Sequence, residues 1–221
     1  MHPSLKTDRN KGIGNIFEIV YIYIFIYIIF MHISDGIIDT NVCIAAGAVS
    51  IGLVYISGRK ATVDEIPTMG MMGAALFVAS LIHFPLAGTS MHLGLFGIAG
   101  IILGKRSFPP VFAALLFQSL IFQHGGLVTL GVNSLNMGAG AFAGWLIWRT
   151  KFMNENIRAL LAGFLGIIIP VLLMSVEFRL SGYGRGIIYL LSVYVIAAVV
   201  ESIITLGAVR FIRRVKPALL P

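Results

Sequence analysis

Long apolar segments alternate with short polar breaks along most of this chain, and this pattern constrains the fold more than any other feature. Gly, Pro or charged residues separate the segments, which cover about 40–57, 67–84, 91–104, 109–123, 134–148, 156–177 and 186–210. A helix that crosses a bilayer needs about 20 mainly apolar residues. The pattern therefore predicts an all-α, polytopic membrane protein with about seven transmembrane helices in a compact bundle.

The composition supports a membrane environment. Apolar residues make up 58% of the 221 positions and charged residues only 11%, and the mean hydropathy is +0.95. The formal net charge of +7 is carried by short clusters between apolar segments. This charge therefore indicates how the chain is oriented in a membrane rather than an affinity for nucleic acid. The single cysteine, Cys43, lies in an apolar segment and excludes an internal disulfide or a thiolate cluster. We predict the lipid bilayer as a partner and no nucleic acid.

Two of the segments, 91–104 and 109–123, are shorter than an upright bilayer-spanning helix. Non-helical backbone is tolerated inside a membrane only where protein buries it or where it lines a cavity. We therefore expect these short segments to end inside the protein, next to a central site.

Lysine and arginine are distributed unevenly between the loops, and this predicts the orientation. Loops 31–39, 85–91 and 124–133 contain neither residue, whereas 177–185 is an exception. The basic clusters follow the first, third, fifth and seventh segments: Arg59, Lys60, Lys105, Arg106, Arg149, Lys151, Arg210, Arg213, Arg214 and Lys216. The sequence predicts a multi-pass protein of the cell membrane with Met31 on the outer side and the C-terminus in the cytoplasm.

Four of the five histidines fall on the predicted outer side: His32, His83, His92 and His124. A single histidine near a helix end is usually only a hydrogen-bonded polar residue, but four on one side favour a shared function. Neutral imidazole is a common ligand of nickel, cobalt, copper and zinc. The chain has no His-Glu-x-x-His pattern. We therefore predict capture of an incoming metal ion and no enzymatic activity.

Residues 1–30 differ from the rest of the chain. Positions 16–30 contain no Ala, Gly or Leu, whereas the remainder is rich in all three. Three alternatives remain open: a start of translation at Met31, a cleaved signal sequence, and a retained anchor helix. The large Ile28 and Phe30 stand where signal cleavage requires small residues. Because translated A/T-rich noncoding DNA has a similar composition, we favour a start at Met31.

A start at Met31 would place a metal-chelating sequence at the N-terminus. The amine of Met31, the backbone nitrogen of His32 and its ring nitrogen could then close adjacent chelate rings around one ion. A deprotonated amide in such a set favours square-planar geometry, and geometry helps proteins to select among late divalent metals. One further ligand would complete the site. On this basis we assign 31–216 to a transmembrane metal-binding domain and 217–221 to a cytoplasmic tail.

Four motifs resemble those of the CbiM/NikM family, the substrate-capture (S) components of energy-coupling-factor transporters for cobalt and nickel. The resemblance covers nearly the whole chain from residue 31. The first and third motifs are the most specific. The motifs are Met31-His32-Ile33-Ser34-Asp35-Gly36, Gly88-Thr89-Ser90-Met91-His92-Leu93-Gly94, Gln123-His124-Gly125-Gly126-Leu127-Val128-Thr129-Leu130-Gly131-Val132-Asn133 and Glu201-Ser202-Ile203-Ile204-Thr205.

The resemblance implies one square-planar Co(II) or Ni(II) ion as the transported substrate, with no organic cofactor. The ligands would be the Met31 amine, the His32 amide and ring nitrogens, and a ring nitrogen of His92, with the N-terminal segment inserted into the bundle. His124 and Asn133 would support these ligands through hydrogen bonds. The choice between cobalt and nickel stays open, because the nickel-type sequence Ser-His-Pro-Thr-Gly is absent at the His92 motif.

The resemblance also implies partners: a membrane coupling (T) subunit, ATPase subunits and a small accessory membrane subunit. Residues 100–107 superficially resemble a phosphate-binding loop, but the glycine spacing is wrong and Arg106 follows Lys105 where Ser or Thr is required. ATP hydrolysis is therefore expected on separate subunits. The alternative is a stand-alone secondary metal-ion permease, which would need ionisable residues on several mid-membrane helices; only Glu201 clearly qualifies.

Three other polar residues have less certain roles in the sequence. Asp35 could neutralise the site, but it is expected to cap the start of the next helix. Glu201 interrupts the last apolar segment, where it could form a structural hydrogen bond, dock a partner subunit or act in a conformational switch. We expect His83 to be structural.

Overall fold

The computed structural model describes residues 32–86, 89–182 and 187–221. The helices are α2 (Thr40–Gly58), α3 (Glu65–Ala79), α4 (Phe96–Leu103), α5 (Phe108–Phe122), α6 (Leu130–Trp148), α7 (Glu155–Leu180) and α8 (Ile187–Val215), with two 3-10 turns, η1 (Gly104–Arg106) and η2 (Pro217–Leu219). Two short strands, β1 (His83–Leu86) and β2 (Thr89–His92), pair as an antiparallel hairpin. The predictions for 1–30 and for Met31 lie outside the described residues.

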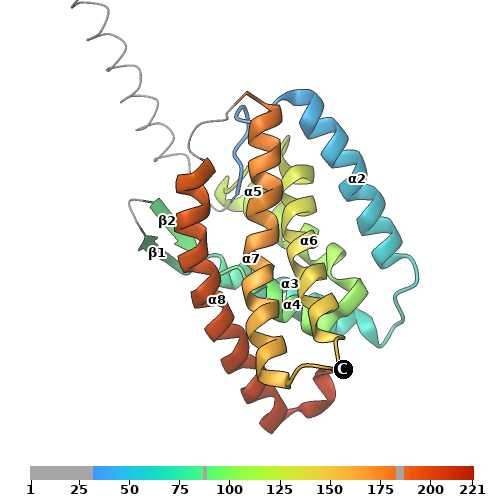
Figure 1. The fold of residues 1–221 in the computed structure, drawn as a ribbon. Coiled ribbons are helices and arrows are strands. Elements are labelled where there is room, and N and C mark those ends of the chain that lie inside the picture. The colour runs from blue at the N-terminus through green and yellow to red at the C-terminus, as the bar shows by residue number, and fades with distance from the viewer. Residues whose placement is uncertain (1–31, 87–88, 183–186) are drawn as a thin grey trace, which may run out of the picture.

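The predicted helical bundle is confirmed within the described ranges (Figure 1). Three helices are long and apolar enough to cross a membrane by length and composition: Thr40–Gly58, Glu155–Leu180 and Leu190–Val215. Their outward surfaces carry large exposed apolar side chains such as Ile44 and Ile203, as a lipid-facing helix requires. The helices α3 and α5 have 15 residues each. The predicted total of seven crossings remains a prediction.

The apolar segment 91–104 is not a single transmembrane helix. It begins at the end of β2, and its helix α4 has only eight residues, which corresponds to about 12 Å of length. The preceding segment is also shorter than predicted, because α3 ends at Ala79 and the chain then enters the hairpin. Non-helical backbone therefore lies beside a short buried helix, as the short apolar segments predicted.

Small residues allow α4 to sit deep in the bundle, in contact with α6, α7 and α8. A Cβ atom at Gly97 would lie 2.6 Å from the carbonyl oxygen of Ala162 on α7, and one at Gly100 would lie 1.9 Å from that of Ala141 on α6. Neither contact is possible for a larger residue without movement of backbone. Glycine therefore allows the close approach of α4 to its neighbouring helices.

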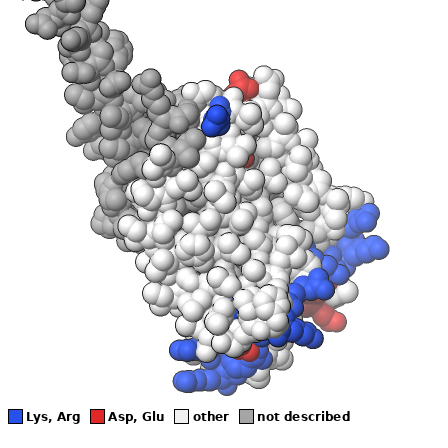
Figure 2. All heavy atoms as spheres, in the orientation of Figure 1, with Lys and Arg blue, Asp and Glu red and all other residues white. Residues whose placement is uncertain are grey.

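The basic clusters meet at one end of the bundle (Figure 2). Arg106 in η1 donates to the carbonyl oxygens of Ser57 (2.7 Å) and Lys60 and forms a 3.2 Å ion pair with Glu65. Arg213 near the end of α8 pairs with Glu155 at the start of α7. The segments that were predicted to share one side of the membrane therefore lie together at this end, whereas Gly94 and Leu95, next to His92, contact Glu201 in the middle of α8.

The packing of α4 yields a stability prediction. Gly100→Ala should lower the unfolding free energy by about 1–3 kcal/mol, because overpacking forces backbone or side chains to move. The matched control is Gly70→Ala on α3, where an added Cβ has no atom within 4 Å. The measurement is the thermal midpoint of the detergent-purified protein. Equal midpoints for the two variants would contradict the close packing of α4 on α6.

Candidate metal centre

The segment that carries His32 is held in the bundle through the backbone of the next residue. Ile33 donates its N–H to Asn133 Oδ1 at 2.8 Å, and Asn133 Nδ2 donates to the Ile33 carbonyl oxygen at 2.8 Å. Thr129 Oγ1 donates to the same carbonyl at 2.7 Å. Asn133 and Thr129 stand at the start of α6. The extended segment therefore satisfies its polar groups inside the protein, and His32 is only 1% exposed.

Asp35 fixes the same segment from its other side. Its Oδ1 accepts from the backbone N–H of Thr129 at 2.9 Å and from the Thr129 hydroxyl at 3.1 Å. The expectation that Asp35 caps the next helix was wrong, because Asp39 is the N-cap of α2 and accepts from Asn41 N at 2.9 Å. Asp35 instead stabilises the N-terminus of α6, where backbone donors lack intrahelical partners.

Gly126 makes room for this carboxylate. A Cβ atom there would lie 1.8 Å from Asp35 Oδ1. The neighbouring Gly125 has a left-handed backbone with φ of 77°, and its own Cβ would lie 3.3 Å from the Cβ of His32. The two glycines therefore let the loop after α5 close over the His32 segment.

His92 lies at the end of β2, directly opposite His83 in the hairpin. Its Nδ1 lies 3.0 Å from the carbonyl oxygen of Leu93, a contact that requires a proton on Nδ1 and leaves the lone pair on Nε2. His92 Nε2 lies 3.1 Å from His32 Nε2. Like His32, His92 is buried, with 3% exposure.

His124 brings a third imidazole from the end of α5. The C-cap Gln123 adopts a left-handed backbone with φ of 54°, which ends the helix and redirects the chain at His124. The His124 ring centroid lies 4.9 Å from that of His32 and 5.2 Å from that of His92. One ring nitrogen from each of the three histidines lies within 4.8 Å of the others. Residues about 30 and 60 positions apart in the chain therefore converge on a point that could hold one metal ion.

The surroundings keep these imidazoles neutral. Burial, followed by repulsion from His92 and His124, lowers the pKa of His32 well below its ordinary value. Burial lowers the pKa of His92 to about 3 and that of His124 to about 4. All three rings are therefore unprotonated near neutral pH, the state in which imidazole binds a metal.

The ring of His32 has an unused ligand atom. Its Nδ1 is buried and has no hydrogen-bond partner among the described residues, although buried polar atoms are nearly always paired. Nδ1 is also the ring nitrogen closest to the residue's own backbone, so it suits the chelate predicted for the Met31-His32 sequence. The position of Met31 lies outside the described residues.

Comparison with known proteins decides the family. The profile described as "Cobalt uptake substrate-specific transmembrane region" matches residues 32–219. The chain belongs to the CbiM family. This match includes every described histidine of the cluster and both buried glutamates on α7 and α8.

Relatives of this CbiM-family chain are named as metal transport proteins. A putative metal transport protein of Haemophilus influenzae is 30% identical over 85% of this chain and 95% of its own length. A cobalt transport protein CbiM of Geobacter sulfurreducens is 32% identical over 86% of this chain, which spans 61% of that relative. A putative fused nickel transport protein NikMN of Archaeoglobus fulgidus is 30% identical over 85% of this chain and 67% of its own length.

A solved structure has the same fold. A crystal structure described as a transition metal transporter superimposes with a TM-score of 0.73 at 23% identity and covers 83% of this chain and 93% of its own. A second, truncated transition metal transporter gives a TM-score of 0.71 at 22% identity, with 83% and 98% coverage. The bundle described above is therefore an arrangement that transition metal transporters adopt.

His83 lies closer to the centre of this CbiM-family protein than the sequence suggested. Its ring centroid is 5.7 Å from that of His92 and 5.5 Å from that of His124, yet its side chain is exposed. Its Nδ1 lies 3.1 Å from the carbonyl oxygen of Leu81. His83 therefore stands at the exposed rim of the cluster.

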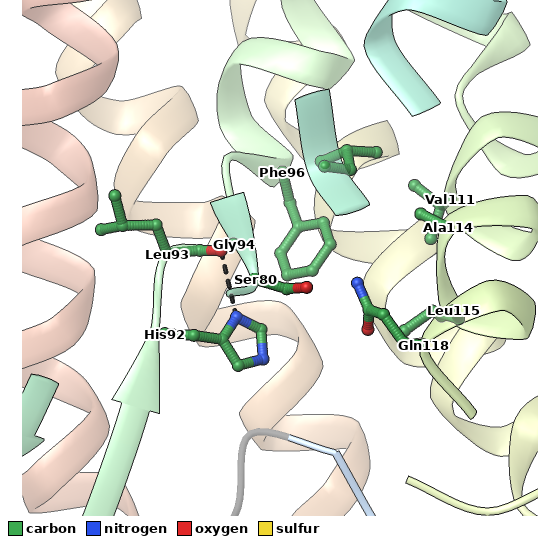
Figure 3. A pocket seen from close by; sticks show the side chains of 10 residues that line it. Ser80, His92, Leu93, Gly94, Phe96, Val111, Ala114, Leu115 and Gln118 are labelled. Carbon is green, nitrogen blue, oxygen red and sulfur yellow. Dashed lines mark hydrogen bonds between the residues drawn. The ribbon is translucent and has the colours of Figure 1, made fainter. Parts of the chain in front are cut away.

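Two buried polar side chains were not predicted from sequence. Gln118 of α5 is 3% exposed and, with Ser80 and His92, lines a cavity of about 10 Å³ (Figure 3), a volume that suits about one water molecule. Glu177 was read as part of a loop but is buried in α7, where Asn136 Nδ2 donates to it at 2.7 Å. A polar residue inside an apolar segment was the available signal for Gln118.

The support of Asp35 by Gly126 gives a prediction about metal binding. Gly126→Ala should displace Asp35 from Thr129, loosen the His32 segment and weaken nickel binding about 10–100-fold, the usual effect of losing a group that orients ligands. Gly52→Ala on α2, whose added Cβ meets nothing within 4 Å, is the control. The measurement is a calorimetric titration with Ni(II). A Gly126→Ala protein that binds as tightly as the control would refute this role.

Proposed function

We propose that the protein is the substrate-specific membrane component of an ATP-driven cobalt or nickel uptake transporter, and that it binds one divalent ion at an outer-face site. The main support is the convergence of His32, His92 and His124 on one point of the bundle. The rings of His32 and His92 are buried and that of His124 is partly buried, and the buried Nδ1 of His32 lacks a partner among the described side chains. This is the donor set expected for a late first-row transition metal.

The proposed ligands are the Met31 amine, the His32 amide and ring nitrogens, and the His92 ring. Membership in the CbiM family and the names of the cobalt and nickel transport relatives support this choice of substrate. The short contact between the His32 and His92 rings supports their use by one ion. His124, whose ring faces both, would orient them or serve as an additional ligand.

The proposed orientation has the histidine cluster outside and the basic end in the cytoplasm. Positively charged loops are retained on the cytoplasmic side of a membrane. The basic residues gather at the end formed by η1, the start of α7 and the end of α8 (Figure 2). In this orientation the histidine cluster would be reached by ions that arrive from outside.

The proposed partners are a membrane coupling subunit, ATPase subunits and a small accessory membrane subunit. Relatives named as fused nickel transport protein NikMN and putative fused cobalt transport protein CbiMQ support the presence of further membrane components. ATP hydrolysis on separate subunits would provide the free energy for uptake. The protein itself would bind the ion and release it to the inner side.

The ligand assignment predicts the effect of two substitutions. His32→Ala and His92→Ala should each weaken Ni(II) or Co(II) binding by more than about 100-fold, because loss of a direct ligand exceeds the roughly 10–100-fold effect of an orienting partner. His83→Ala, at the exposed rim, should change the equilibrium affinity little. Titration of the purified proteins with each metal is the measurement. Unchanged affinity in both His32→Ala and His92→Ala would show that the site is assigned wrongly.

The chelate also requires a free amine at Met31. Intact mass measurement and N-terminal sequencing of the membrane-inserted protein should show a chain that begins at Met31. A chain that begins at Met1 would leave Met31 as an ordinary amide, and the four-nitrogen site could not form. Metal binding would then depend on the three imidazoles and other ligands.

A further inference from the structure

Glu201 is an acidic residue inside the apolar helix α8 and is only 3% exposed. An ionisable group at such a position is unfavourable unless it has a specific partner. Its Oε1 accepts from the backbone N–H of Gly94, and both carboxylate oxygens lie 3.2 Å from the N–H of Leu95. Both donors belong to the short connection between His92 and α4, so Glu201 is tied to the segment that carries a proposed metal ligand.

Close backbone packing brings this carboxylate to the connection. A Cβ atom at Gly163 on α7 would lie 2.7 Å from the carbonyl oxygen of Glu201, and one at Gly166 would lie 2.7 Å from the backbone nitrogen of Gly97 on α4. Ser202 Oγ also donates to the Leu160 carbonyl oxygen of α7 at 2.5 Å. The start of α4 and the middle of α8 are therefore both pressed against the same turns of α7, which fixes the position of Glu201.

The connection needs such support, because its backbone is strained. Leu95 is the N-cap of α4 and has a left-handed conformation with φ of 52°, which costs a non-glycine residue about 1–2 kcal/mol. Its N–H and that of Gly94 come before the first turn of α4, where no intrahelical partner exists. A buried carboxylate is a strong acceptor for two such donors, and strained conformations persist only where surrounding contacts determine them.

The connection also determines where the His92 ring points. The Leu93 carbonyl oxygen accepts the Nδ1 proton of His92 (Figure 3). This leaves Nε2 directed at His32. The peptide unit that supplies this carbonyl oxygen is the one whose N–H, on Gly94, donates to Glu201. One planar peptide group therefore lies between Glu201 and His92, and it cannot turn without breaking both hydrogen bonds.

We propose that Glu201 is a positioning residue for the metal ligand His92, acting through the Leu93–Gly94 peptide group. The inference rests on the proposed function, because it takes His92 as a ligand. It also distinguishes between the roles left open by the sequence. A carboxylate that is 3% exposed is not available for docking a partner subunit, and its hydrogen bonds run to the ligand-bearing connection rather than to a side chain of a neighbouring helix.

The test compares two buried carboxylates. Glu201→Ala should weaken Ni(II) binding about 10–100-fold and shift the visible absorption band of the nickel-saturated protein, because the His92 ring is no longer held in one orientation. Glu201→Gln, whose carbonyl oxygen can still accept one hydrogen bond, should recover part of the affinity. Glu177→Ala is the matched control: Glu177 is also buried in a long apolar helix, but it accepts from Asn136 of α6 and not from the connection.

A second measurement does not depend on metal. In the metal-free, full-length protein, amide hydrogen exchange of peptides that cover residues 91–96 should be faster in Glu201→Ala than in wild type or Glu177→Ala. If wild type binds neither nickel nor cobalt, the proposed function fails, and the exchange rates still decide whether Glu201 holds the connection. If wild type binds metal, then equal affinity and an unshifted band in Glu201→Ala, or an equal loss in Glu177→Ala, would overturn the positioning role alone.

Discussion

Non-helical backbone inside an apolar bundle must find hydrogen-bond partners, and the arrangement of this centre depends on that requirement. Two stretches of such backbone approach each other: the segment after His32 and the connection after His92. The first pairs with Asn133 and Thr129, and the second with Glu201. His32, Ile33 and His92 are buried, and an unpaired N–H or C=O group in such surroundings would cost several kcal/mol. The polar side chains within the helices are therefore required by the loops that they hold.

This requirement also explains why the histidines are suited to a metal ion. The side chains that satisfy the loops fix the backbone on either side of His32 and His92, so both rings are oriented before an ion arrives. Burial lowers their pKa values, and protons then compete little with the metal near neutral pH. A rigid set of neutral donors favours an ion whose preferred geometry matches it, which is a means of selection that bare affinity does not provide.

The helical class and the grouping of His32, His92 and His124 were predictable from sequence. Apolar segment length predicts helices, and the distribution of lysine and arginine predicts that the histidine loops share one side of the membrane. The hairpin was not predicted, because residues 85–91 were assigned to a loop between two apolar segments. The hydrogen-bond donors to Glu201 could not be predicted either. The N–H groups of Leu95 and Gly94 lie 106 and 107 positions away in the chain, and only the packing of α4 and α8 on α7 brings them to Glu201. Asp35 and Asp39 could both cap α2 by residue type, and tertiary contact with Thr129 decided between them.

The course of α8 gives the Glu201 contact a wider significance. Glu201 lies in the middle of α8, and the last turns of this helix reach the basic end, where Arg213 pairs with Glu155 and Arg210 donates to Asn156. A helix is stiff along its axis, so displacement of its basic end by a partner subunit would move Glu201 as well. Because the hydrogen bonds of Glu201 have narrow geometric limits, a small shift of α8 would break them and release the Leu93–Gly94 peptide group. The His92 ring would then lose its fixed orientation, and the ion would be bound less tightly. Under the proposed function, the Glu201 contact would thus both prepare the centre for capture and supply a physical route by which the basic end of α8 could weaken it.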